Sequence, residues 1–376
     1  MLWMSAHELE FAYMGTGKMK ERRNSDRMTA RERIKGLILN QPIDRVPFIP
    51  FFLGYLARDN GLKLYDFFTK PHIAFKAGIE TMKAYPWASI RPAYDWADHG
   101  AWEFGGKIGW PETDERMTPF TPEPLIGEPG EVNSLPEPDP LETDWFRHFS
   151  TFNEICIQHA FSAQLPSASI MSPMSSILGS TRLMKWMIKH PEAVHRLAEK
   201  VLRFNTKVAR ITLEKYGAKN CGAMTQVPLE SNRVLSPDAF EEFCLPYITK
   251  LHALYLDSGV RTTMIHLCGD HKGNLKYWKK VPVPERAIFS IGDDMDLKET
   301  GDFFGKKFIL AGNMSTTILQ FGTKAEIKEE ARRCLEQAKG RPGGFILMPA
   351  CEWPPMAPPE NLEAVREALM EYGFYW

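Results

Sequence analysis

Long apolar segments, an excess of charge of one sign and a dense set of cysteines are all missing from this sequence of 376 residues. No run approaches the roughly 20 apolar residues that a membrane-spanning helix needs. The 46 Lys and Arg residues balance 47 Asp and Glu residues, so no global field favours nucleic acid or an anionic membrane. We therefore expect a cytoplasmic protein that binds neither nucleic acid nor membranes.

The six cysteines are widely scattered, whereas a secreted disulfide framework is denser and its chain is shorter. We therefore interpret most of them as free thiols of a cytoplasmic protein. Four fall in helical or strand patterns and are interpreted as structural: Cys156, Cys221, Cys244 and Cys334. The other two, Cys268 and Cys351, each follow an apolar run.

The first 28 residues are of mixed composition and end in a charged stretch. They contain no apolar segment with a small-residue cleavage site, so they do not predict a signal peptide. We expect residues 1–28 to form a flexible or loosely docked extension, and residues 29–376 to form one domain.

Short apolar runs alternate with helical patterns along the rest of the chain. This alternation is typical of parallel strands that helices cover on both faces. Eight such strands over this length predict the α/β class and a (β/α)8 TIM barrel. An open, doubly wound sheet is the alternative, but the glycine-rich fingerprint that usually follows its first strand is missing. The expected strands are 46–52, 87–91, 167–171, 222–227, 261–267, 287–291, 308–311 and 345–349.

Three potential metal ligands stand at the ends of two of these strands. His266 and Cys268 lie at the end of the fifth, and Cys351 follows the eighth. Residues two apart on a strand point to the same face, and active sites of such barrels lie where the strands end. Zinc accepts two thiolates and an imidazole, and three protein ligands leave a fourth position open for chemistry. The alternative is a hydrogen-bonded core histidine beside ordinary thiols.

Other polar residues are candidates for the same mouth of the barrel. Asp270 and Glu352 adjoin the ligands and are catalytic candidates, either as hydrogen-bond acceptors behind the ligands or as a fourth ligand in the resting state. The alternative is that they are solvated loop carboxylates. Asp95 follows the second strand and is the catalytic candidate that we would test first. The aromatic stretch 87–110 either lines a substrate pocket or packs, and we favour packing. The substrate-binding candidates could each cap the following helix instead, and they are Gln226, Glu230, Asp293 and Asn313.

Several stretches of the chain resemble the uroporphyrinogen decarboxylase superfamily. They are residues 29–50, 235–246, 310–323 and 343–361, and the resemblance extends over roughly 29–374. It implies a (β/α)8 barrel. True uroporphyrinogen decarboxylases carry an Arg-Gln-Ala-Gly-Arg stretch after the first strand. That stretch is missing from residues 50–58 here, so we do not expect porphyrinogen decarboxylation.

Within this superfamily the chain is similar to the methylcobamide:coenzyme M methyltransferases and related corrinoid-dependent methyltransferases. Members of that branch bind zinc through His-x-Cys and a distant Cys, which His266, Cys268 and Cys351 match. The resemblance implies zinc, a corrinoid (methylcobamide) on a partner protein, and methyl transfer to a thiol.

Several alternatives to thiol methylation stay open. Tetrahydrofolate could replace the thiol as the methyl acceptor, or the enzyme could remove the methyl group of a methoxylated substrate. A metal-free lyase of the decarboxylase type and a non-catalytic partner of a corrinoid protein are the other two. The sequence leaves a homodimer possible.

Overall fold

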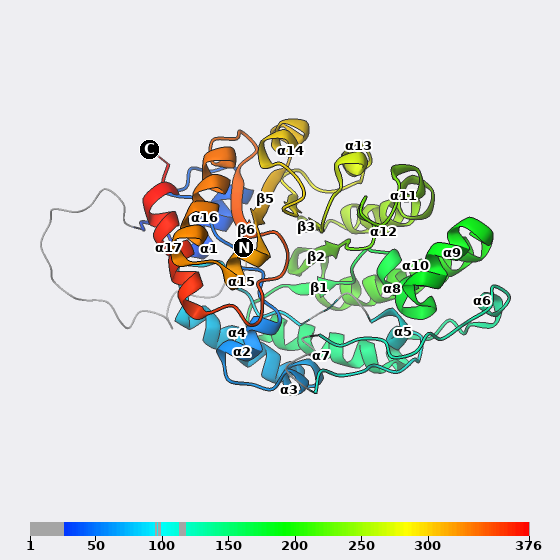
Figure 1. The fold of residues 1–376 in the computed structure, drawn as a ribbon. Coiled ribbons are helices and arrows are strands. Elements are labelled where there is room, and N and C mark those ends of the chain that lie inside the picture. Colours follow the sequence, from blue (N-terminus) through cyan, green and yellow to red (C-terminus); the bar gives the residue numbers. More distant parts are fainter. Residues whose placement is uncertain (1–25, 95, 97–98, 113–117, 376) are drawn as a thin grey trace, which may run out of the picture.

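The computed structural model describes residues 26–94, 96, 99–112 and 118–375 (Figure 1). Six parallel strands are hydrogen-bonded in the order in which they occur along the chain. Helices connect successive strands and lie around the outside of this row (Figure 1). The strands are β1 (Ala163–Leu165), β2 (Cys221–Gln226), β3 (Thr262–Leu267), β4 (Ile288–Ile291), β5 (Ile309–Met314) and β6 (Phe345–Pro349).

The row of strands continues past β6 through the segment that the sequence predicts as the first strand. Phe48 pairs in parallel with Leu347, and the Ile49 amide donates to the Leu347 carbonyl at 3.0 Å. The Ser89 amide in turn donates to the Phe48 carbonyl at 2.8 Å. These two segments therefore stand where the first and second strands of the barrel are expected.

The predictions for these first two strands are nevertheless wrong in detail, because 46–52 and 87–91 are not regular strands. Pro47 and Pro50 lack an amide hydrogen, which interrupts any ladder through 46–52. The third predicted strand, 167–171, is also wrong in position, since β1 ends at Leu165 before Pro166 and residue Met171 already begins a helix. The other five predicted strands are confirmed to within three residues at each end.

The helices follow the start signals in the sequence. Thr29 and Thr323 each form a capping box with the glutamate three residues later, and Ser236 caps the helix that begins at Pro237. The helices before β2 are α1 (Ala30–Ile38), α2 (Gly54–Asp59), α3 (Leu64–Thr69), α4 (Pro71–Ala84), α5 (Gly100–Glu103), α6 (Glu131–Ser134), η1 (Pro140–Glu142), α7 (Asp144–Gln158), α8 (Met171–Leu178), α9 (Ser180–Lys189), α10 (Pro191–Tyr216) and η2 (Ala218–Asn220). The later ones are α11 (Pro237–Phe243), α12 (Leu245–Asp257), η3 (Lys272–Asn274), α13 (Leu275–Trp278), α14 (Leu297–Phe304), α15 (Thr316–Phe321), α16 (Lys324–Ala338) and α17 (Pro359–Tyr372).

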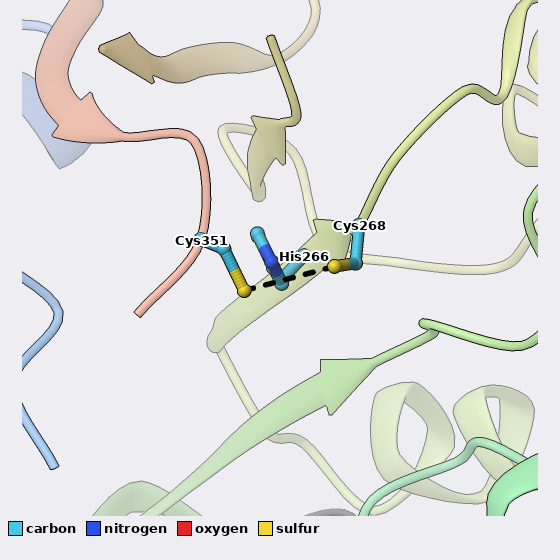
Figure 2. A group of neighbouring side chains, drawn as sticks. All are labelled: His266, Cys268 and Cys351. Carbon is cyan, nitrogen blue, oxygen red and sulfur yellow. Dashed lines mark hydrogen bonds between the residues drawn. The ribbon is translucent and has the colours of Figure 1, made fainter. Parts of the chain in front are cut away.

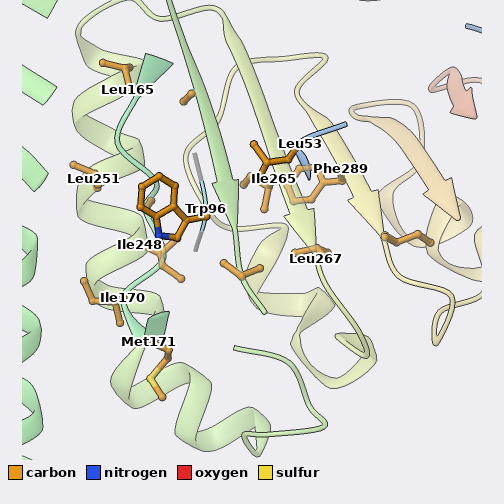
Figure 3. Packing of buried hydrophobic residues seen from close by; sticks show 14 of the residues in the cluster. Leu53, Trp96, Leu165, Ile170, Met171, Ile248, Leu251, Ile265, Leu267 and Phe289 are labelled. Atoms are coloured by element: carbon orange, nitrogen blue, oxygen red, sulfur yellow. The ribbon is translucent and has the colours of Figure 1, made fainter. Parts of the chain in front are cut away.

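The core lies on both faces of the strands. Every residue of β4, β5 and β6 is buried, as expected of parallel strands that are covered on both sides. Figure 3 shows Ile265 and Leu267 of β3 and Phe289 of β4 in this core, with Ile248 of α12 on the neighbouring helix. Each such side chain contributes about 1.5–3 kcal/mol when it leaves water. No described helix is both long and apolar enough to span a bilayer.

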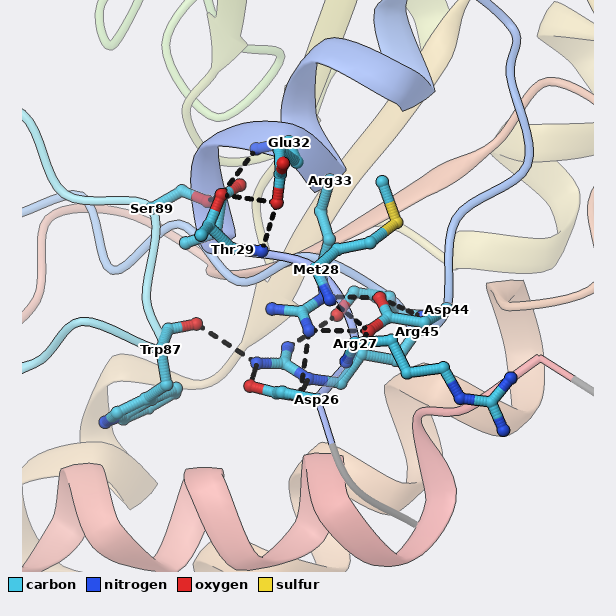
Figure 4. Close-up of polar contacts among 12 residues, drawn as sticks. Asp26, Arg27, Met28, Thr29, Glu32, Arg33, Asp44, Arg45, Trp87 and Ser89 are labelled. Atoms are coloured by element: carbon cyan, nitrogen blue, oxygen red, sulfur yellow. Dashed lines mark hydrogen bonds and ion pairs between the residues drawn. The ribbon is translucent and has the colours of Figure 1, made fainter. Parts of the chain in front are cut away.

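The predicted N-terminal extension, 1–28, lies outside the described residues except for its last three. Those three are tied to the barrel (Figure 4). Asp26 forms ion pairs with Arg33 and Arg45, and the amides of Arg27 and Met28 donate to Asp44. Residue 26 is therefore already part of the folded domain.

Candidate metal centre

His266, Cys268 and Cys351 lie together at the ends of β3 and β6 (Figure 2). One potential ligand atom from each residue lies within 4.8 Å of the other two. The two sulfur atoms point toward one another, with the imidazole of His266 beside them (Figure 2). The structure therefore brings together the three residues that the strand pattern placed at one mouth.

The sulfur atoms have a separation that suits a tetrahedral metal ion. Cys268 Sγ and Cys351 Sγ are 3.7 Å apart. Two thiolates that each bind zinc at about 2.3 Å in tetrahedral geometry lie about 3.8 Å apart. A disulfide would bring the atoms to about 2.05 Å, and both residues are free cysteines. The pair of thiols fits zinc without rearrangement.

His266 presents one nitrogen to this site. It is buried, and its Nδ1 shares a hydrogen bond of 2.8 Å with Oγ of Ser290 on β4. Its Nε2 has no hydrogen-bond partner among the residues that the structure describes. A buried nitrogen without a partner is costly, so a ligand at Nε2 would satisfy it. Metal-bound histidines usually have such an outer partner on the second nitrogen.

The two thiols influence each other's protonation. The hydrogen bond from Cys268 lowers the pKa of Cys351 in spite of its burial, and His266 lowers it further. The same hydrogen bond, together with burial, raises the pKa of Cys268. A metal ion that binds here displaces the thiol protons and gains two thiolate ligands.

The two carboxylates beside the ligands differ in their surroundings. Glu352 Oε1 accepts a hydrogen bond of 2.7 Å from the Gly54 amide, and burial raises the pKa of Glu352 to about 7. The Trp353 amide donates to the Phe51 carbonyl, so two bonds fix the loop after β6 to residues 51–54. Asp270 is partly exposed, and its Oδ1 accepts from the Lys272 amide within a turn. Glu352 thus positions the Cys351 loop, whereas Asp270 stabilises its own turn.

The remaining predicted site residues do not all reach the centre. Asp293 is exposed. Asn313 is buried and saturated, because its amide donates to the Gly292 and Met295 carbonyls and accepts from Arg333. These bonds hold Asn313 within the fold, and its role in substrate binding stays a prediction. Asp95 lies outside the described residues.

Glu230 and Gln226 are the other two predicted substrate-binding residues. Glu230 is buried and accepts from Ser169 Oγ and from the amides of Ile170 and Met171, at the start of α8. Burial raises its pKa. It therefore accepts from the first amides of α8, which precedes it in the chain, whereas Ser236 caps the helix that follows it. Gln226 is the register partner of His266 on the neighbouring strand and lines a pocket.

Sequence reasoning missed three polar residues, one bonded to His266 and two in the pocket that Gln226 lines. Ser290 lies in the middle of a buried apolar strand, and its sequence context gives no sign of the bond to His266. His99 and Glu103 line the pocket beside Gln226, with His99 Nδ1 2.9 Å from Glu103 Oε1. Their spacing of four residues is a signal that could have paired them on a helical turn.

Comparison with known proteins places the chain among relatives of two kinds. It is 29% identical over 207 residues to the methylcobamide:CoM methyltransferase MtaA of Methanosarcina barkeri, covering 53% of this chain and 55% of that protein. A uroporphyrinogen decarboxylase of Geobacter sulfurreducens is 31% identical over 134 residues, covering 34% of this chain and 36% of that enzyme. The chain thus matches about half the length of the methyltransferase and about a third of the decarboxylase.

The fold and the family are supported over most of the chain. A solved methyltransferase structure from Methanosarcina mazei matches 92% of this chain and 99% of its own, with a TM-score of 0.74 and 20% sequence identity. That likeness supports the predicted barrel. The family model for uroporphyrinogen decarboxylase (URO-D) matches residues 29–372. The chain therefore belongs to the uroporphyrinogen decarboxylase (URO-D) family.

Proposed function

We propose that this protein is a zinc-dependent methyltransferase, which moves a methyl group between a corrinoid on a partner protein and a thiol. The observation that carries the proposal is the cluster of His266, Cys268 and Cys351, with ligand atoms within 4.8 Å of one another. The similarity to a methylcobamide:CoM methyltransferase supports the choice of reaction. The zinc-binding role of the three residues is part of the same proposal.

The residues of the site suit a thiol nucleophile. What zinc supplies when bound is a lower pKa for a thiol in its open fourth position. Two thiolates, from Cys268 and Cys351, balance the charge of the ion, so the sulfur of the substrate keeps much of its electron density. Ser290 holds the imidazole of His266 with Nε2 toward the site. The thiol would release its proton to solvent, and its sulfur would form a bond to the methyl carbon while the cobalt–carbon bond of the partner's corrinoid breaks and leaves its electron pair on cobalt.

A metal-free lyase is the main competing reaction, since decarboxylases are also relatives. The Arg-Gln-Ala-Gly-Arg stretch of those enzymes is missing from residues 50–58. Such a lyase would also give no reason for two thiols and an unpartnered imidazole nitrogen to meet at the ends of β3 and β6. These observations favour the methyltransferase.

The assay that tests the proposal uses methylcobalamin and a panel of small thiols, with zinc-loaded protein. We expect methyl transfer to the thiol. We also expect Cys351→Ser and His266→Ala each to lower the rate at least about 100-fold, because each substitution removes a proposed zinc ligand. Cys221→Ala is the matched control. Cys221 is the first residue of β2, whereas the proposed ligands lie where the parallel strands β3 and β6 end. Full activity in both ligand variants would contradict the proposal.

A further inference from the structure

A pocket at the barrel mouth has a cavity volume of about 360 Å³, which lies within the range of small-molecule sites. Three segments of the chain form its walls: the loop that contains Thr121 and Pro124, the helices α8 and α9 with Gly179 between them, and the loop after β2. Five hydroxyl side chains line it, together with two prolines, Leu229 and Gly179. We call it the hydroxyl pocket.

The hydroxyl pocket begins next to the strand that carries His266. Its residues Pro228 and Leu229 come directly after Val227, just past the carboxyl end of β2. The Val227 amide donates to the His266 carbonyl at 3.1 Å. The pocket and the proposed metal centre therefore open at the same end of neighbouring strands. A ligand that reaches both must extend across the end of β2.

The lining of the hydroxyl pocket carries no charge. Among its described residues there is no Asp, Glu, Lys, Arg or His. A charged group on a ligand would lose part of its hydration in this pocket without gaining a counter-ion. The lining therefore favours an uncharged group that forms hydrogen bonds and also packs on apolar side chains.

Two of the five hydroxyls hold the walls together, and another two are left for a ligand. Ser176 Oγ accepts from the Ala101 amide at 2.8 Å and lies 2.6 Å from Thr121 Oγ1, which joins α8 to α5 and to the loop that contains Thr121. Ser175 Oγ lies 2.8 Å from Ser180 Oγ. That bond uses one hydroxyl hydrogen, so the pair keeps a second donor and has lone pairs on both oxygens.

We infer that the hydroxyl pocket binds a neutral carboxamide arm of the corrinoid that carries the methyl group. A carboxamide donates through its nitrogen and accepts through its oxygen, and the pair of Ser175 and Ser180 can satisfy both. The carbon chain of the arm would pack on Pro228 and Leu229. This inference rests on the proposed function, in which the corrinoid is the partner in methyl transfer.

The size of the corrinoid distinguishes it from the other substrate. A corrin ring carries uncharged amide arms that extend outward from cobalt on all sides, so one arm can cross the end of β2 while the methyl group lies at the metal centre. A small thiol has its sulfur at the metal and only a short tail. The hydroxyl pocket therefore belongs to the corrinoid and not to the thiol.

The test compares two free corrinoids that differ in the ends of their arms. Methylcobinamide carries carboxamides, whereas methylcobyrinic acid carries carboxylates at neutral pH. Equilibrium dialysis with metal-free protein, read by the absorption of the corrin ring, gives the two dissociation constants. We expect methylcobinamide to bind about tenfold more tightly, which is the effect of one or two hydrogen bonds. No partner protein is present, so a side-chain amide of that partner cannot produce the result.

Two variants of the pocket test the residues. Ser175→Leu fills the space, and a double variant, Ser175→Ala with Ser180→Ala, removes both hydroxyls without filling it. Each should weaken the binding of methylcobinamide about tenfold and leave methylcobyrinic acid unchanged. Ser258→Leu is the matched control, because Ser258 is exposed at the end of α12 that precedes β3.

Two results of the dialysis would overturn the inference. One is equal affinity of the wild-type protein for the two corrinoids. The other is an unchanged affinity for methylcobinamide in the double variant, whose small side chains leave the packing of α8 intact. Circular dichroism shows whether Ser175→Leu keeps its fold, and if it does not, the double variant alone decides.

The methyl-transfer assay separates this inference from the proposed function. With zinc-loaded protein we expect Ser175→Leu to raise the KM for methylcobinamide about tenfold and to leave the KM for the thiol unchanged. Methyl transfer with an unchanged KM for the corrinoid in this variant would support the proposed function and overturn the inference. The predicted order of corrinoid binding without any methyl transfer would contradict the proposed function and support the pocket.

Discussion

At the scale of single residues, one hydrogen bond decides which nitrogen of His266 faces the two thiols. Nδ1 is engaged with Ser290, and Nε2 is left toward the site. The three proposed ligands could be found from the sequence, because His266, Cys268 and Cys351 all stand at strand ends. Ser290 could not, because its importance arises only when β4 lies beside β3.

Replacement of the outer partner tests this role of Ser290. We expect Ser290→Ala to weaken zinc binding by about 10-fold to 100-fold, because the imidazole loses the bond that orients it. Competition with a chromophoric chelator measures the affinity. Ser258→Ala, at an exposed helix end, should bind zinc like the wild type. Equal affinity in Ser290→Ala would mean that packing alone, including the Phe51 ring 5.2 Å from the imidazole, orients His266.

At the scale of elements, the sequence was informative where strands are uninterrupted and misleading where proline breaks them. The runs that became β2 to β6 have no proline before their last residue, and their predicted positions were nearly correct. Pro47 and Pro50 remove donors from the run 46–52, and Pro166 follows the last residue of β1. The run 87–91 contains no proline, and its Ser89 amide bonds to the Phe48 carbonyl without a regular strand. Helix starts were easier to predict from the sequence, because a capping residue bonds to amides only a few residues away.

Helix α1 is fixed to the barrel by the carboxylate of Asp44. Arg33 donates to both its oxygens, and the amides of Arg27, Met28 and Arg45 add further bonds. Burial alone would raise the pKa of Asp44, but the bonds from Arg33 and the amides lower it to about 2. The side chain is 7% exposed, so solvent screens this interaction little.

The lowered pKa predicts a pH-dependent contribution to stability. Asp44 is ionised above its unfolded pKa of 3.8, and there its bonds contribute about 2 kcal/mol to the free energy of unfolding. This contribution should be lost as the pH falls from about 4 to about 2. Urea unfolding of Asp44→Asn should therefore differ most from wild type above pH 4, with the difference shrinking toward pH 2.

Asp302→Asn is the control for that comparison, because Asp302 is an exposed carboxylate paired with Lys298 on α14. Exposed pairs of this kind contribute less than about 1 kcal/mol. A difference between Asp44→Asn and wild type that stays constant between pH 7 and pH 2 would contradict the assignment.

At the scale of the whole molecule, the barrel explains why residues 83 positions apart in the chain meet. All strands run in parallel, so β3 and β6 end on the same side, and the loops after them carry Cys268 and Cys351. This much could be predicted from the alternation of strands and helices. The pocket that Gln226 lines could not, because Glu103 and Asn205 reach it from α5 and α10, which are far apart in the sequence.

The central claim is that these three residues hold one zinc ion, and metal analysis of protein purified without chelators tests it most directly. We predict one zinc per chain, and X-ray absorption with two sulfur ligands and one histidine nitrogen from the protein. Cys268→Ser and Cys351→Ser should each lose most of the metal, and Cys221→Ala should keep it. A wild-type content well under one zinc per chain, or unchanged zinc in both ligand variants, would contradict the account.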